Sequence, residues 1–146
     1  MASLADTNIL VYCFDSRELT RRAQARELLR RGADENSILI PHQALVEFVS
    51  VVTRRKGYAT PLLPEEEAIR QAEGFMTDFQ VLYPNEGVFH TALQGMATYR
   101  LPWFDAHLWA YAVHYGIPEL LSEDFEHGRK YGSVRVRNPF LAPGLA

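Results

Sequence analysis

One stretch of sequence decides the fold of this chain: Ser3-Leu4-Ala5-Asp6-Thr7-Asn8-Ile9-Leu10-Val11-Tyr12. Two apolar runs flank a polar triplet, and the first run is too short to form a helix. The pattern predicts a short buried strand that ends at Asp6, then a polar turn, then a second apolar element. It therefore places a carboxylate at the end of a buried strand, among apolar side chains.

Strands and helices are expected to alternate through the rest of the chain. Gly32 is interpreted as the end of the first long helix, and Pro64 as the start of a later helix with three glutamates in its first turn. The apolar stripe of that later helix is assigned to Ile69, Ala72, Met76 and Phe79. Further helices are predicted over 17–31, 42–56, 87–99 and 103–115, and strands over 37–40, 81–83, 119–121 and 134–136. This alternation is typical of an α/β fold with a central, mostly parallel sheet flanked by helices.

Composition and charge bound the class of protein. The chain has 146 residues, of which 47% are hydrophobic, and a single cysteine, so residues 1–146 are predicted to form one domain without a disulfide. No apolar stretch reaches the ~20 residues of a membrane helix, and no secretory signal is recognisable, so a cytoplasmic location away from membranes is expected. The net charge of −3 argues against nucleic-acid binding by bulk charge alone.

Four carboxylates occupy positions that favour a shared site: Asp6, Glu47, Asp105 and Asp124. Asp6 and Asp124 each follow a predicted strand, whereas Glu47 and Asp105 lie early in predicted helices. Ligands of open α/β sheets bind at the carboxyl ends of the strands, so the four side chains are expected at one edge of the sheet. Their mutual repulsion would raise some of their pKa values unless a divalent cation neutralised them, and an all-oxygen ligand set suits Mg²⁺ or Mn²⁺.

Other interpretations of these residues remain open at this point. Asp6 and Asp105 could cap or charge-stabilise helices, and Glu47 could lie on a helix surface. Glu123 and Glu126 are interpreted as solvated charges. The histidines show no zinc-ligand spacing and there is no thiolate pair, so a zinc site is not expected. Five basic residues are candidates for RNA contacts, although they could equally be solvated helix ends: Arg54, Arg55, Lys56, Arg129 and Lys130.

The order of these motifs resembles that of the PIN domain across nearly the whole chain. The resemblance rests on Asp-Thr-Asn at residues 6–8, a glutamate within an apolar helix, Trp-Phe-Asp-Ala at 103–106 and Ser-Glu-Asp-Phe at 122–125. It is strongest to the ribonuclease toxins of VapBC-type toxin–antitoxin pairs. The resemblance implies a PIN-like three-layer sandwich and an Mg²⁺- or Mn²⁺-dependent endoribonuclease that hydrolyses RNA phosphodiester bonds with metal-activated water.

The same resemblance implies roles and partners. Asp6, Glu47, Asp105 and Asp124 match the catalytic, metal-binding acids, with Asp6 and Asp105 the first candidates for direct ligands. Thr7, Asn8 and Ser122 match polar positions that hydrogen-bond these acids or metal-bound water. The partners implied are an RNA substrate, a small cognate antitoxin and a second copy of the chain in a homodimer.

Two alternatives compete with this reading. An aspartyl-phosphate hydrolase or receiver-like domain would use Asp6 as the nucleophile, but Asn8 replaces the second aspartate that the hydrolase motif needs. A non-enzymatic PIN-like module that binds nucleic acid or protein would be expected to have lost acids, and this chain retains all four. Cleavage of RNA with and without a chelator separates the three possibilities.

Overall fold

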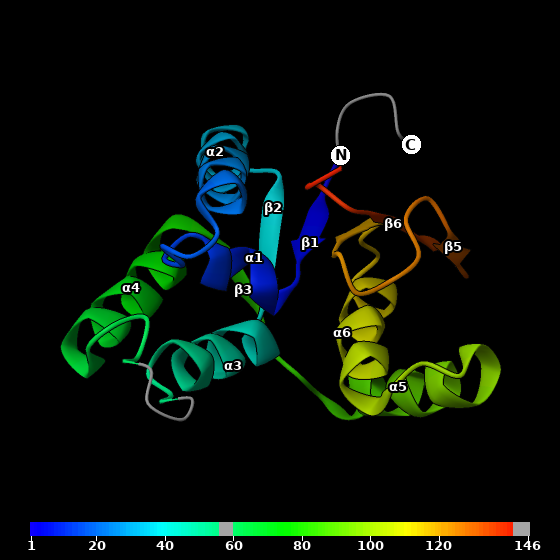
Figure 1. Cartoon of the computed structure of the whole chain (residues 1–146). Coiled ribbons are helices and arrows are strands. Elements are labelled where there is room, and N and C mark those ends of the chain that lie inside the picture. The colour runs from blue at the N-terminus through cyan, green and yellow to red at the C-terminus, as the bar shows by residue number, and fades with distance from the viewer. Residues whose placement is uncertain (56–59, 142–146) are drawn as a thin grey trace.

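A computed structural model of the chain describes residues 1–55 and 60–141. Six strands form one sheet in the order β3-β2-β1-β4-β6-β5 (Figure 1). All neighbouring strands pair in parallel except β5 and β6, which are antiparallel. The strands are β1 (Ser3–Ala5), β2 (Ile38–Pro41), β3 (Gln80–Leu82), β4 (Glu119–Leu121), β5 (Lys130–Tyr131) and β6 (Val134–Arg137). The mostly parallel sheet predicted from the sequence is confirmed.

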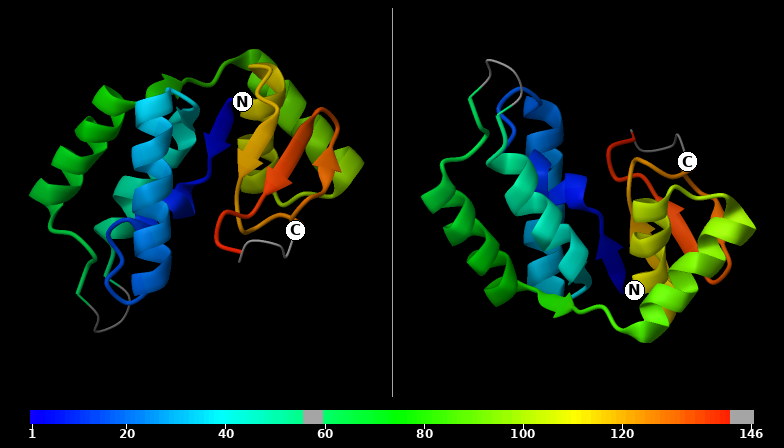
Figure 2. Two further views of the ribbon diagram at one scale, coloured as in Figure 1. Left: turned by 90° about the horizontal axis from the view of Figure 1, so that it is seen from above. Right: turned by 90° about the horizontal axis from the view of Figure 1, so that it is seen from below.

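Helices cover both faces of this sheet, which makes three layers (Figure 2). One face carries α1 (Thr7–Tyr12), α2 (Leu19–Glu35), α3 (His42–Val52) and α4 (Glu65–Asp78). The other face carries α5 (Glu86–Tyr99) and α6 (Trp103–His114), which pack against each other. The three-layer α/β sandwich expected from the sequence is therefore the fold that forms.

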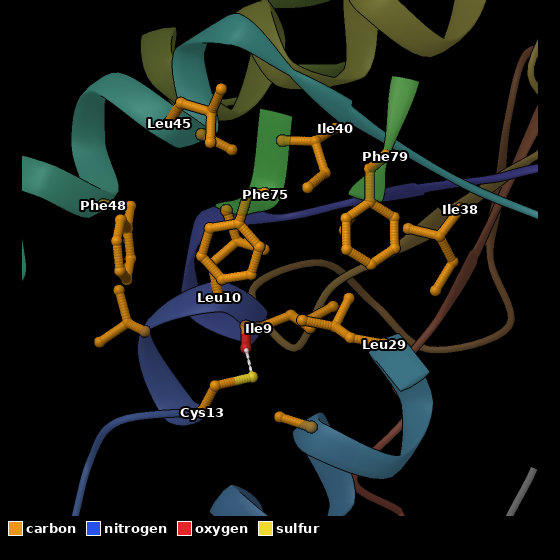
Figure 3. Close-up of a cluster of buried hydrophobic side chains, with 14 of the residues drawn as sticks. Ile9, Leu10, Cys13, Leu29, Ile38, Ile40, Leu45, Phe48, Phe75 and Phe79 are labelled. Carbon is orange, nitrogen blue, oxygen red and sulfur yellow. Dashed lines mark hydrogen bonds between the residues drawn. The ribbon is translucent and has the colours of Figure 1, made fainter. Parts of the chain in front are cut away.

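Each face of the sheet has its own hydrophobic core, because side chains alternate along a strand. On β1, Ala5 packs toward α1–α4 and Leu4 toward α5 and α6; on β4, Leu121 and Leu120 divide in the same way. Figure 3 shows the first core, where phenylalanines of α3 and α4 meet isoleucines of α1 and β2. The two cores fix the strands between them and leave the strand ends free to carry polar side chains.

The region after β1 differs from the prediction. Thr7–Tyr12 is not a turn followed by an apolar run but a short helix, α1, that begins directly after Asp6. The polar triplet provides the N-terminal turn of this helix, which keeps its backbone N–H groups close to the site described below. Hydrophobic periodicity over six residues cannot separate a short helix from a strand, which is why the sequence did not reveal it.

Gly32 does not end α2, as the sequence suggested. The helix continues to Glu35 and ends at Asn36, whose φ of 52° is the left-handed conformation common at helix C-termini. Gly32 is needed for packing instead, because a Cβ atom at this position would lie 2.3 Å from Cδ1 of Ile38. The glycine lets α2 approach β2 closely.

Three other boundaries or faces differ from the prediction. α3 ends at Val52, earlier than predicted. In α4, Ala68 and Phe75 are buried, whereas Ile69 and Met76, which were assigned to the apolar stripe, are exposed. The two-residue strand β5 was missed because it is held by pairing with β6 rather than by a pattern of its own.

A buried polar cluster closes the amino end of the sheet. The Ser3 hydroxyl donates to Glu119 Oε1 at 2.6 Å, and Arg137 donates to both oxygens of Glu119 at 3.2 Å. Ser3 and Glu119 are the first residues of β1 and β4, so they lie at the opposite end of the strands from Asp6 and Asp124, and Arg137 reaches them from the end of β6. The cluster satisfies a buried carboxylate and ties β4 to β6.

Within the described residues, no helix is long and apolar enough to span a membrane.

Candidate functional site

The candidate site lies at the carboxyl ends of the two central strands. The chain leaves β1 toward β2 and β3 on one side and later returns to β4 on the other side. At such a change of direction, open parallel sheets usually bind ligands in the crevice outside the strand ends. Asp6 follows β1, and Ser122 and Asp124 follow β4. The four acids predicted from the sequence are placed at this edge.

Asp6 is the most buried of the four carboxylates. Its residue is only 5% exposed, and its backbone N–H donates to the Leu121 carbonyl at 3.1 Å. The Ser122 hydroxyl donates to Asp6 Oδ2 at 2.5 Å. Asp6 stands in the N-cap position of α1, but its side chain makes no capping hydrogen bond. The cap interpretation of Asp6 is therefore wrong, and the carboxylate is free to face the crevice.

Asp124 is held beside Asp6 by short-range polar contacts. Its backbone N–H donates to Ser122 Oγ at 3.1 Å, so the same hydroxyl binds the backbone of one acid and the side chain of the other. The Asn8 amide, from the first turn of α1, donates to Asp124 Oδ2 at 3.1 Å. Asn8 and Ser122 thus position acids, as the resemblance implied.

Glu47 reaches the site from α3 and is held at both oxygens. Thr7 donates its hydroxyl to Oε2 at 2.8 Å, and the Gln43 amide donates to Oε1 at 2.8 Å. Thr7 is at the start of α1, whereas Gln43 precedes Glu47 by one turn of α3. These two bonds fix the direction of a carboxylate that is half-buried, so Glu47 is not a freely rotating surface residue.

Gln43 also joins helices from opposite faces of the sheet. Its amide donates a further hydrogen bond to the Phe104 carbonyl at 3.1 Å, in the first turn of α6. Its oxygen lies 2.7 Å from His107 Nδ1. Because the amide nitrogen is the donor to Glu47 and Phe104, the oxygen accepts and His107 Nδ1 carries a proton. Gln43 therefore fixes the start of α6, which carries Asp105, relative to Glu47. No pattern in the sequence indicates this role.

Electrostatic coupling connects all four acids. Burial, reinforced by the charges of Asp124 and Asp105, raises the pKa of Asp6 to about 7, although the Ser122 hydrogen bond opposes the shift. Burial also raises the pKa of Asp105, with the charges of Asp124 and Glu47 adding to the effect. The pKa of Asp124 is raised by burial and by Glu123 and Glu47. Like charges at short range thus destabilise the ionised forms of these groups.

The donor set fits a hard divalent cation. Carboxylate oxygens surrounded by hydroxyl and amide donors are the ligands that Mg²⁺ and Mn²⁺ prefer, and a positive ion would relieve the mutual repulsion of the acids. Across 1–55 and 60–141, no three carboxylate, histidine or cysteine side chains are already arranged as a metal-binding group. The chemistry of these residues nevertheless fits such a cation.

The remaining predicted residues fall into different environments. Glu123 is not simply solvated, because it accepts hydrogen bonds from the Tyr12 hydroxyl and from Arg21, whereas Glu126 is exposed beside Arg129. Arg54 and Arg55 are exposed at the end of α3. The guanidinium of Arg129 stacks on the Tyr131 ring at 4.4 Å, and Lys130 is exposed on β5. Lys56 lies outside the described residues.

A comparison with protein families matches most of the chain. The family model described as the PIN domain matches residues 4–132. This range includes all four acids and the polar residues that hold them. A comparison with curated proteins finds no match.

Comparison with solved structures gives the same fold at low sequence identity. VapBC2 from Rickettsia felis, bound to a DNA fragment from its promoter, is 15% identical with a TM-score of 0.69, covering 94% of this chain and 98% of the other. A toxin–antitoxin complex from Klebsiella pneumoniae is 16% identical with a TM-score of 0.67 and the same coverage. VapC20 from Mycobacterium tuberculosis, a sarcin–ricin loop cleaving toxin, is 16% identical with a TM-score of 0.57, covering 82% of this chain and 87% of the other. At these identities the likeness concerns the fold.

Proposed function

Because the chain belongs to the PIN domain family, we propose that it is a metal-dependent endoribonuclease and the toxin of a VapBC-type toxin–antitoxin pair. The observation that carries the proposal is the meeting of Asp6, Glu47, Asp105 and Asp124 at one edge of the sheet, with repulsion that a cation would relieve. A bound divalent cation would supply a hydroxide nucleophile at neutral pH and stabilise the charge that develops on the scissile phosphate.

Around such an ion, some residues of the chain would bind it and others would orient the residues that bind it. Asp6, Glu47, Asp105 and Asp124 would hold it, because burial and neighbouring carboxylates raise the pKa of all three aspartates and a cation would favour their ionised forms. Thr7 and Gln43 hold Glu47 in a fixed direction, and Ser122 joins Asp6 to Asp124. These hydrogen bonds orient Asp6, Glu47 and Asp124 before a substrate arrives.

Two protein partners are expected, an antitoxin at the acidic site and a second copy of the chain at α5. We expect a small antitoxin to suppress the activity by inserting an arginine among the acids, where its charge would replace that of the cation.

A homodimer is supported by α5, which exposes three apolar side chains at helical spacing, Phe89, Leu93 and Met96. Substitution of Leu93 by glutamate should then shift the sedimentation of the chain from dimer to monomer.

RNA cleavage by the purified chain tests the proposed activity. We expect cleavage with Mg²⁺ or Mn²⁺, none in EDTA, and none with Asp105→Asn in any metal. Asp78→Asn, an exposed aspartate at the end of α4, is the matched control and should cleave like the wild type. A single-stranded DNA of the same sequence measures the preference for RNA. Cleavage that persists in excess EDTA, or in Asp105→Asn, would refute the proposal.

A further inference from the structure

An open pocket adjoins the acidic site between α3 and the start of α6. It has a volume of about 370 Å³ and is lined by Val46, Glu47, Ser50, Val51, Arg54 and Phe104. That volume lies within the range of small-ligand sites, about 300–1,000 Å³. Glu47 belongs both to this pocket and to the acidic site, so a polymer bound at the acids would extend into the pocket. Its walls combine apolar side chains with one cation.

Phe104 is the most exposed aromatic side chain of this region. It is 67% exposed, and Val46, which lines the same pocket, is 56% exposed. Within the described part of the chain, no other aromatic ring stacks on Phe104, whereas the adjacent Trp103 packs edge-on against Phe89. The Phe104 carbonyl accepts the hydrogen bond from Gln43, so its backbone is fixed relative to the helix that carries Glu47. The result is an exposed aromatic ring, on a backbone fixed in position, beside a carboxylate of the site.

Arg54 provides the charge at the other end of the pocket. It lies just beyond the end of α3, seven residues after Glu47 in the sequence, and lines the same pocket. Its Nη2 atom donates to Ser50 Oγ at 3.0 Å, and no carboxylate of the described residues lies within ion-pair distance. The guanidinium therefore keeps donors for an anionic group, and a planar guanidinium suits a phosphate. An aromatic face and a cation in one groove match the chemistry of a single-stranded nucleotide.

We propose that this pocket is a nucleotide subsite, in which a base of single-stranded RNA stacks on Phe104 over Val46 and a flanking phosphate binds Arg54. The proposal rests on the proposed ribonuclease function and adds the part of the substrate that the acids do not bind. An unpaired base is required, because a base inside a duplex presents no free face to Phe104. The subsite therefore predicts a preference for unpaired RNA next to the scissile bond.

Binding of a short fluorescent single-stranded RNA tests the subsite. Every protein in this experiment carries Asp6→Asn, so that the RNA stays intact, and the chain with Asp6→Asn alone is the parent. Fluorescence anisotropy is measured in Mg²⁺. Phe104→Ala should weaken binding about tenfold, within the range expected for one stacked base, and Arg54→Ala should weaken it and reduce its salt dependence. Phe104→Trp should keep the affinity, whereas Phe104→Leu, which is apolar but has no aromatic face, should not. Met76→Ala removes an exposed apolar side chain from α4, away from the pocket; it is the control and should bind like the parent.

A second measurement uses the active chain and an RNA with one abasic nucleotide, moved stepwise along the strand. At one position the missing base should raise the KM of the wild type about tenfold with kcat unchanged, and at that position Phe104→Ala should show no further loss. Equal RNA binding by the parent and Phe104→Ala, or full rescue by Phe104→Leu, would overturn the subsite while leaving the ribonuclease function intact. If instead the parent bound no RNA and the wild type cut none, the proposed function itself would fail.

Discussion

Replacing Asp6 by asparagine should make the metal-free protein more stable at alkaline pH. Burial and the neighbouring carboxylates raise the pKa of Asp6 from 3.8 to about 7. The folded state therefore binds a proton that the unfolded state has released, and stability falls as the pH rises between these two values. A shift of about three pKa units corresponds to ~4 kcal/mol of lost stability above pH 7. Asparagine has the shape of aspartate without the charge, so it avoids this loss.

The expected gain is smaller than the full electrostatic loss. The asparagine amide places N–H donors where the carboxylate had only acceptors, and buried donors without partners cost ~1–2 kcal/mol. We therefore expect Asp6→Asn to raise the free energy of unfolding in EDTA by ~2 kcal/mol at pH 8. At pH 5 less than half of the electrostatic loss, ~1–2 kcal/mol, has developed, and the cost of the buried amide offsets it, so the gain should vanish.

Urea unfolding in EDTA at pH 5 and pH 8 measures this difference. Asp78→Asn removes one exposed carboxylate from α4 and should show the same effect at both pH values. Adding Mg²⁺ at pH 8 should stabilise the wild type more than Asp6→Asn, because the ion binds only the folded site and the substitution removes one ligand. A variant that unfolds more easily than the wild type at pH 8 in EDTA would show that Asp6 is a structural residue, and the reasoning about repulsion would be wrong.

Three further predictions concern packing and positioning. Gly32→Ala should lower the free energy of unfolding by ~1–2 kcal/mol, because the added Cβ would lie 2.3 Å from Ile38 Cδ1. Gly74→Ala in α4 should raise it by up to ~1 kcal/mol, because no atom lies within 4 Å of the added Cβ and alanine favours a helix over glycine. Chemical denaturation compares the two variants. Burial raises the pKa of the Cys13 thiol to about 12, so a thiol reagent at pH 8 should modify Cys13 only after unfolding, and rapid labelling of the native chain would contradict this. Gln43→Ala should lower cleavage about tenfold and weaken Mg²⁺ binding in calorimetry, since Glu47 and the start of α6 lose their shared donor; an unchanged Mg²⁺ affinity would argue against this role.

The sequence predicts those parts of the fold that local pattern determines. β4 is predicted at its observed bounds, because the apolar pair Leu120–Leu121 lies between Pro118 and the polar residues that follow it. Asp6 and Asp124 could be placed at the sheet edge because Asp6 directly follows β1 and Asp124 lies three residues after the end of β4. The positions of Glu47 and Asp105 near the starts of helices could be predicted from the pattern alone, although their roles in the site rest on the family resemblance.

The remainder depends on contacts between distant segments. Gln43 has no distinguishing neighbours in the sequence, and its role arises only because α3 and α6 meet at the strand ends. Glu123 looks like any surface glutamate until Tyr12 and Arg21 are brought beside it. Gly32 resembles a helix stop, and only the approach of α2 to β2 shows that it is a packing glycine. The partners of Gln43 in α6 and those of Glu123 lie between 61 and 111 residues away along the chain.

The division of the acids between the two faces of the sheet has a mechanical consequence. Glu47 is anchored in the core beneath α1–α4, whereas Asp105 is anchored in the core beneath α5 and α6. An ion bound by acids from both sides would add a cross-link between two cores that are joined by strands of three or four residues and by the hydrogen bonds of Gln43 to α6. Fluctuations that part the α5–α6 layer from the sheet would then be suppressed when the ion binds. In hydrogen-exchange measurements, Mg²⁺ should therefore slow the amides of α6 as well as those beside Asp6, far beyond the reach of direct coordination.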